Sequence, residues 1–238
     1  MNFAIIAAGE GSRLAAGGIE TPKPLIAIGG TTLIDRLIAI FMRHKASSIS
    51  IIVNEEASLV IEHLQKLSLP IPLNLIIKST AGSMHSLYEL KPFLQNNDFC
   101  LTTVDTVFLE NEFTDYLNAF HTNRSIDGLM AATNFIDDEK PLYIATNDKK
   151  QITDFCDQRP TNCNYISGGI YCLRPKALDV LEKTIASGMT RMRDFQRQLI
   201  RQGLTLNAFP FSKIVDIDHP CDIATAENFI GNSETLKS

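Results

Sequence analysis

Residues Ala7–Gly30 read AAGEGSRLAAGGIETPKPLIAIGG. This glycine-rich segment follows a short apolar run, FAIIAA at 3–8, which is typical of a strand buried on both faces. Glycine loses more backbone freedom on folding than any other residue, so the segment is costly to order. We therefore expect a bound polyanion to compensate for this cost. We also expect the loop from Gly9 to Thr21 to be mobile without that ligand.

Strand and helix signals alternate after this segment. Apolar runs at 48–53, 73–78 and 98–104 predict strands, and periodic segments at 31–45, 54–67, 84–94 and 112–123 predict helices. Thr32 with Asp35 suggests a capping box, and Asn54 is a candidate N-cap. Such β-α units predict a mostly parallel sheet whose ligands bind at the carboxyl ends of the strands. The glycine loop and Asp105 both follow strands, so we expect them to face one crevice.

The second half of the chain has a different pattern of secondary-structure signals. Short strand candidates at 128–135, 143–148, 151–156 and 165–173 predict antiparallel hairpins. Helices at 175–187 and 192–202, strands at 204–211 and 213–218, and a helix from Pro220 follow. The sequence thus predicts a three-layer α/β/α fold with a mostly parallel central sheet and an antiparallel accessory part. It predicts one domain over 1–238, with a parallel core at 1–127 and a second part at 128–238.

Composition excludes several classes of protein. The formal net charge of -5 argues against a nucleic-acid surface, and no apolar run is long enough to span a membrane. The five cysteines form no CxxC pair and the histidines are scattered, so we expect reduced thiols, a cytoplasmic protein and no zinc site. The sequence does not determine whether the protein forms a homo-oligomer.

The chemistry of the loop suits a polyphosphate. Leu14 stands where a dinucleotide-binding G-x-G-x-x-G motif needs its third glycine. Glycines allow backbone N–H groups to approach phosphate oxygens, and Arg13 can donate two hydrogen bonds to a polyphosphate. Lys23, held between Pro22 and Pro24, offers a point charge for a phosphoryl group in transit.

The pattern G-E-G-S-R followed by P-K-P-L resembles the nucleotidyltransferase superfamily, which joins NTPs to phosphorylated acceptors. Later segments resemble further landmarks of that superfamily in order along nearly the whole chain. They are TVD ending at Asp105, GSMHSLYEL from Gly82, ISGGIYCL from Ile166 and VDIDHPCDIATAE from Val215. The resemblance implies a Rossmann-like fold of the GT-A type.

The resemblance also implies a reaction. In it, an acceptor phosphate or phosphonate oxygen attacks the α-phosphorus of an NTP in line, with Mg²⁺, and pyrophosphate leaves. Arg13 is expected to bind the pyrophosphate and Lys23 to stabilise charge at the α-phosphate. The remaining assignments are Ala8, Gly9, Gly11, Ser12, Gly82 and Ser83 for the nucleotide, Asp105, Asp218 and Asp216 for Mg²⁺, and Gly169, Lys213 and Arg193 for the acceptor.

Each assignment has a structural alternative. Ser83 also suits a helix cap, Asp105 a turn, and Lys213 and Arg193 a solvated surface. If the segment 213–218 is a strand, Asp216 and Asp218 share a face and both reach the ion.

The acceptor is left open by the sequence. Sugar 1-phosphates, giving NDP-sugars, are the commonest acceptors of the superfamily, whereas the 82–90 and 215–227 segments also resemble cytidylyltransferases for phosphocholine or phosphonates. A choline headgroup needs an aromatic cage, for which the candidates are Tyr88, Tyr143, Tyr165 and Tyr171. A GT-A glycosyltransferase is a rival, but it leaves Lys23 unexplained and expects a D-x-D motif where Asp105-Thr106-Val107 stands. A non-enzymatic nucleotide sensor is a third alternative, and the base is not determined.

Overall fold

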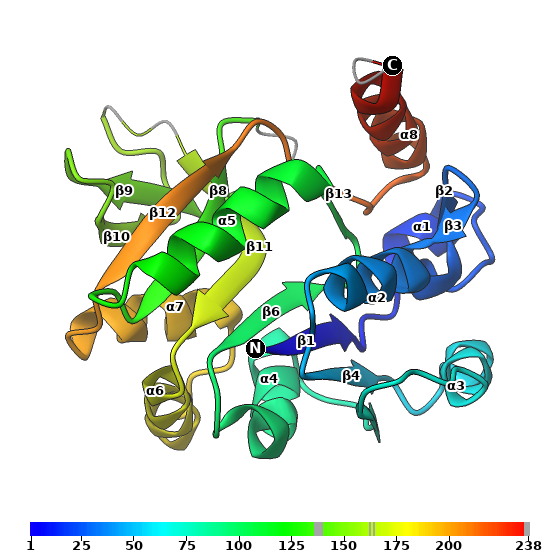
Figure 1. Cartoon of the computed structure of the whole chain (residues 1–238), viewed down its shortest axis with the longest axis horizontal. Coiled ribbons are helices and arrows are strands. Elements are labelled where there is room, and N and C mark those ends of the chain that lie inside the picture. The colour runs from blue at the N-terminus through cyan, green and yellow to red at the C-terminus, as the bar shows by residue number, and fades with distance from the viewer. Residues whose placement is uncertain (136–139, 162, 164, 236–238) are drawn as a thin grey trace.

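The computed structural model describes residues 1–135, 140–161, 163 and 165–235. Its central element is β1 (Asn2–Ala7), all of whose residues are buried, with β4 (Ser48–Val53) and β6 (Phe99–Thr103) parallel to it on either side. β5 (Leu73–Ile77) continues the parallel sheet beyond β4. The order β10-β9-β11-β6-β1-β4-β5 confirms the predicted parallel core (Figure 1).

Helices cover both faces of this sheet, which gives the predicted three layers. One apolar cluster packs α2 (Leu33–Arg43), α3 (Ser58–Gln65) and α5 (Glu110–Thr122) against the sheet. A second cluster packs α4 (Ser83–Leu94), α6 (Lys176–Ala186) and α7 (Met192–Arg201). Figure 1 shows α4, α6 and α7 on the opposite side from α2 and α8. None of the helices in the described part of the chain is long and apolar enough to cross a bilayer.

The second half extends the same sheet. β9 (Tyr143–Thr146) and β10 (Ile152–Cys156) form an antiparallel hairpin, and β11 (Tyr165–Leu173) pairs antiparallel with β6, β8 and β9. However, β12 (Leu206–Phe211) pairs parallel with β8 (Gly128–Thr133), so the accessory part is not wholly antiparallel. After β11 the chain passes through two helices and re-enters the sheet as β12, which runs antiparallel to β11. Because β8 is also antiparallel to β11, β12 and β8 run in the same direction.

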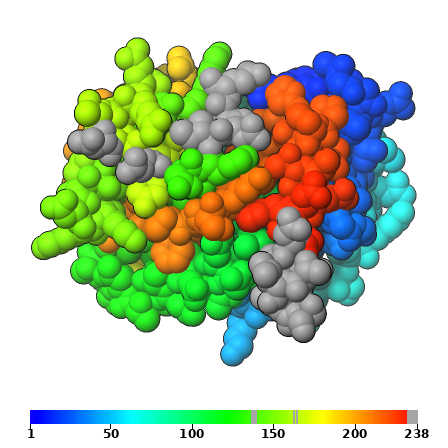
Figure 2. Space-filling view, turned by 90° about the horizontal axis from the view of Figure 1, so that it is seen from above, coloured from blue at the N-terminus to red at the C-terminus, as the bar shows by residue number. Residues whose placement is uncertain are grey.

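Short elements connect these layers around the carboxyl end of β1. They are α1 (Ser12–Ala16), the 3-10 turn η1 (Lys23–Leu25), β2 (Ala27–Ile28), β3 (Thr31–Thr32), β7 (Thr106–Val107) and β13 (Val215–Asp216). β13 pairs with β7 and leads into α8 (Pro220–Thr235). Figure 2 shows this C-terminal segment, orange to red, between the blue N-terminal segment and the green middle of the chain.

Two of the predicted helix starts can be checked. Thr32 is the N-cap of α2, and its hydroxyl accepts a hydrogen bond from the Asp35 N–H at 3.2 Å, as predicted. The prediction that Asn54 caps a helix was wrong, because α3 begins at Ser58. The Asn54 carboxamide oxygen instead accepts from Glu56 N at 2.9 Å and closes a turn before the helix.

Candidate active site

The glycine loop and Asp105 meet at the carboxyl ends of neighbouring parallel strands, β1 and β6. Together they line a cleft of about 330 Å³, which confirms the predicted crevice. Of the residues predicted to bind nucleotide, those that line the cleft are Ala8, Gly9, Gly11, Gly82 and Ser83. Ser12, the first residue of α1, is not among the described lining residues.

Lys23 lies at the junction of two carboxylates. Its ammonium nitrogen is 2.7 Å from Asp105 Oδ2 and 2.8 Å from Asp218 Oδ1. Burial of Lys23 disfavours the charged form, but attraction and hydrogen bonds from Asp105 and Asp218 outweigh it and raise the pKa of Lys23. The side chain is therefore a fixed cation, and only 11% of it is exposed.

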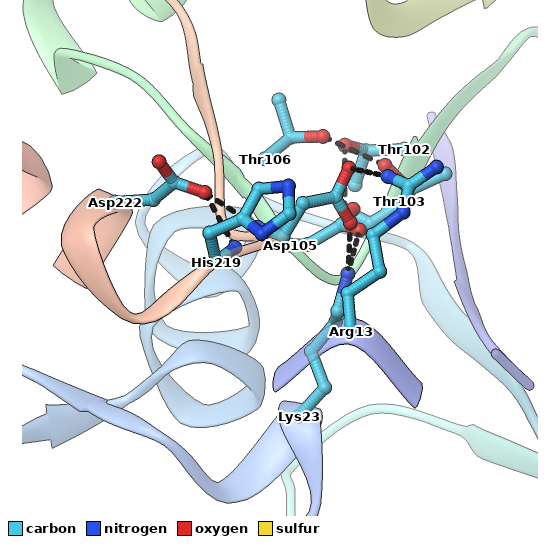
Figure 3. Close-up of polar contacts among 9 residues, drawn as sticks. Arg13, Lys23, Thr102, Thr103, Asp105, Thr106, His219 and Asp222 are labelled. Atoms are coloured by element: carbon cyan, nitrogen blue, oxygen red, sulfur yellow. Dashed lines mark hydrogen bonds and ion pairs between the residues drawn. The ribbon is translucent and has the colours of Figure 1, made fainter. Parts of the chain in front are cut away.

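Arg13 and Lys23 share Asp218. Arg13 Nη1 lies 2.9 Å from Asp218 Oδ2, the carboxylate oxygen that Lys23 leaves free. Burial raises the pKa of Asp218, whereas the Lys23 hydrogen bond and the charges of Lys23 and Arg13 lower it more, so the carboxyl is ionised. Figure 3 shows the side chains of Arg13 and Lys23 next to each other, with the Lys23 ammonium pointing toward Asp105.

The glycine loop is better anchored than the sequence predicts. Gly11 adopts φ 63°, a left-handed conformation, and a Cβ there would stand 3.5 Å from Lys23 Cβ. The next residues form α1, and its Leu14 side chain is buried in the main apolar cluster. Gly17 packs on the first residue of α8, since a Cβ at Gly17 would lie 2.5 Å from Pro220 Cγ. These contacts fix α1 to the body of the protein, and the mobility expected for the loop from Gly9 to Thr21 without its ligand stays a prediction.

Asp222 is a site residue that the sequence analysis missed. Its carboxylate is buried, and Oδ2 accepts hydrogen bonds from the backbone N–H groups of Asp218 at 2.9 Å and His219 at 2.6 Å. Asp222 thus caps α8 and fixes the segment that carries Asp218 (Figure 3). The signal was available in the sequence, because Pro220 marks the first helical position and an acidic residue two positions later reaches back to the helix start.

A second cleft of about 240 Å³ adjoins the first and shares Thr103 and Asp105 with it. Gly169 and Arg193, both predicted to bind an acceptor, line this cleft. Lys213 is not among the described residues that line either cleft, and its ammonium lies 4.0 Å from the centroid of the Phe135 ring. A role for Lys213 in acceptor binding stays a prediction without a contact to support it.

The floor of the second cleft carries buried polar groups. Gln196 is 2% exposed, and its amide donates to Ser167 Oγ at 3.1 Å. Burial, together with the charge of Asp216, raises the pKa of Tyr171 to about 12, against a smaller opposing effect of Ser167. Of the four candidate cage tyrosines, Tyr171 is the one that lines this cleft among the described residues. Gln196 was missed because helical spacing alone does not distinguish a core position from a cleft position.

Asp105 and Asp218 are the carboxylates with the chemistry to hold a metal ion. No group of three or more His, Cys, Asp or Glu side chains capable of holding a metal occurs among the described residues. Asp105 and Asp218 nevertheless approach the same nitrogen atom, and Mg²⁺ commonly takes one or two carboxylates, several waters and substrate phosphates. The strand expected over 213–218 ends at Asp216, where Asp218 N donates back to Asp216 O at 3.2 Å, so the two side chains do not share a strand face. A metal-binding role for Asp216 stays a prediction. Asp216 and Asp218 both line the second cleft.

Two solved structures share this fold. A putative glucose-1-phosphate thymidylyltransferase from Bacillus anthracis superposes with a TM-score of 0.80 at 19% identity, over 96% of this chain and 94% of that one. The inositol-1-phosphate CTP transferase from T. maritima gives a TM-score of 0.77 at 17% identity, over 96% and 97%. Both confirm the predicted nucleotidyltransferase fold of the GT-A type.

Sequence relatives lead to the same family. A bifunctional protein GlmU from Methanococcus maripaludis is 26% identical over an alignment of 242 positions, which covers 98% of this chain and 55% of that protein. A putative mannose-1-phosphate guanyltransferase from Sulfolobus acidocaldarius is 20% identical over 220 residues, covering 92% and 60%. This chain therefore spans about half the length of the curated relatives it matches. The family model for nucleotidyl transferases matches residues 4–233, and the chain belongs to that family.

Proposed function

We propose that the protein transfers a nucleoside monophosphate from an NTP to a sugar 1-phosphate, with Mg²⁺, and releases pyrophosphate. One observation carries the proposal: Lys23, Asp105 and Asp218 converge where a cleft lined by the glycine loop meets a second cleft. A reaction between two bound substrates needs this arrangement, with charged groups at the point of contact. Family membership and the sugar phosphates named for the relatives support the choice.

The chemistry needs no protein nucleophile. An acceptor phosphate oxygen is already anionic, so it forms the new bond to the α-phosphorus as the bond to the β-phosphate bridging oxygen breaks. Pyrophosphate leaves with that electron pair. Lys23 stabilises charge developing on the α-phosphate, and Arg13 turns from Asp218 to the leaving pyrophosphate. Asp105 and Asp218 would hold Mg²⁺, which supplies charge neutralisation between the phosphates.

The second cleft favours a sugar over a choline headgroup. Ser167 and Gln196 offer hydroxyl and amide groups that suit sugar hydroxyls. Lys140 and Arg193 also line the cleft, and the Arg193 guanidinium pairs with Asp157. A quaternary ammonium needs several aromatic faces, and one buried tyrosine does not supply them. The same interpretation assigns residues 1–127 to the nucleotide and residues 128–238 to the acceptor within a single domain.

The test is a pyrophosphate-release assay of four NTPs, each against mannose 1-phosphate, glucose 1-phosphate, inositol 1-phosphate, phosphocholine and a phosphonate. We expect release that depends on one NTP, one sugar 1-phosphate and Mg²⁺, and its loss in Lys23→Ala. Pyrophosphate release with phosphocholine alone would show that the proposed acceptor is wrong but that the reaction class is right. Hydrolysis or glycosyl transfer from a sugar nucleotide without pyrophosphate would instead support a glycosyltransferase, and no turnover across the panel would support a nucleotide sensor.

A further inference from the structure

Lys23 occupies the position between the two carboxylates proposed to hold the metal. A single nitrogen atom lies 2.7 Å from Asp105 and 2.8 Å from Asp218. Arg13 takes the remaining oxygen of Asp218 at 2.9 Å. The charges of these two cations and two carboxylates balance one another.

We propose that Lys23 is a built-in substitute for the divalent cation, so that the metal enters the site only together with the nucleotide. This inference rests on the proposed function for the identity of the metal ligands. It adds that metal and nucleotide binding are positively coupled through one side chain, and that the nucleotide-free protein has no functional metal site.

The argument is one of charge and space. A divalent ion cannot join the two carboxylates while an ammonium lies between them, because like charges repel and the same oxygen lone pairs are engaged. Lys23 is mostly buried, so its departure with no replacement would leave two partly buried carboxylates facing each other, which is costly. Displacement by a metal alone would in turn strand the ammonium without a partner.

A triphosphate removes both obstacles. Lys23 lines the nucleotide cleft as well as the carboxylate cluster, so its ammonium can exchange Asp105 for a phosphate by rotating its side chain. Its backbone stays in place, since η1 is held by Pro22 and Pro24. Arg13 is half exposed and can follow the β and γ charges. The freed carboxylates then need a new counter-charge, which the incoming metal provides, and the coupling is reciprocal.

The test measures Mn²⁺ binding to nucleotide-free protein by electron paramagnetic resonance, independently of turnover. We expect the wild type to bind Mn²⁺ weakly and Asp105→Asn to change that binding little. Lys23→Met should tighten Mn²⁺ binding by about tenfold or more, within the usual range of coupling between sites. Asp105→Asn added to Lys23→Met should abolish the gain.

Lys78→Met is the matched control, because it removes the same charge from an exposed lysine that pairs with Glu89. Equal Mn²⁺ affinities for Lys23→Met and Lys78→Met would overturn the proposal. Tight Mn²⁺ binding by the wild type that is lost in Asp105→Asn would also overturn the proposal. This second result does not depend on whether a Lys23 variant folds. Neither result depends on the acceptor, so a failed transfer assay would leave this inference separately testable.

Discussion

Leu14→Ala should loosen the glycine loop without unfolding the protein. Leu14 is 1% exposed in the main apolar cluster, whereas its neighbours in α1 are exposed. Truncating a buried leucine typically costs about 2–5 kcal/mol. Because α1 is a short surface element, we expect about 2–3 kcal/mol of this cost to appear as easier local opening. Each 1.4 kcal/mol is tenfold, so amide exchange in the loop should accelerate by about 30- to 140-fold.

Hydrogen-exchange mass spectrometry of the peptide over residues 9–19 measures this change. Its reporters are the N–H groups of Ala15, Gly17, Gly18 and Ile19, which donate to loop carbonyls at 3.0–3.1 Å. Leu59→Ala is the matched control, since Leu59 is 57% exposed on α3 and loses the same atoms. NTP with Mg²⁺ should restore protection in Leu14→Ala, and a monophosphate should restore far less. If Leu14→Ala exchanges no faster than Leu59→Ala, the anchoring argument is refuted.

Three further predictions concern the charged cluster. Lys23→Ala should lower kcat by about a hundredfold or more while circular dichroism shows an intact fold, as for loss of one preorganised charge; near-normal turnover would remove Lys23 from the mechanism. EDTA should abolish turnover, and added Mg²⁺ should restore it. Asp105→Asn and Asp218→Asn should each raise the Mg²⁺ concentration needed for turnover or stop turnover. If Asp218→Asn needs the same Mg²⁺ concentration as the wild type, Asp218 is not a metal ligand and Asp216 is the next candidate. Asp222→Ala should raise the Mg²⁺ requirement more than Asp222→Asn, which keeps an acceptor oxygen for the Asp218 N–H; equal effects would make Asp222 a helix cap alone.

Periodicity was sufficient for the parallel core. Buried strands such as 48–53 and the amphipathic segment of α2 have unambiguous patterns, and sheet topology then brings the glycine loop to Asp105. The parallel pairing of β12 with β8 was not predictable in the same way. It depends on where two successive helices return the chain, and local sequence does not encode that position.

The site was predictable where the sequence is unusually rich in glycine and proline. Glycines and prolines around Arg13 and Lys23 indicated a phosphate-binding loop, and Lys23 does reach Asp105 across the fold. The pairing of Lys23 with Asp218 was not foreseeable, because it depends on the distance between residues almost 200 positions apart in sequence. The roles of Gln196 and Asp222 likewise follow from burial and hydrogen bonding rather than from spacing.

The most direct test of nucleotidyl transfer follows a label from the NTP. The protein is incubated with Mg²⁺, a sugar 1-phosphate and the active NTP carrying ³²P at either the α or the γ position, and the products are separated by chromatography. The account predicts that the α label enters the sugar nucleotide and the γ label leaves in pyrophosphate, both only when the acceptor is present. Transfer of the γ label to the acceptor, or release of either label without one, would contradict it.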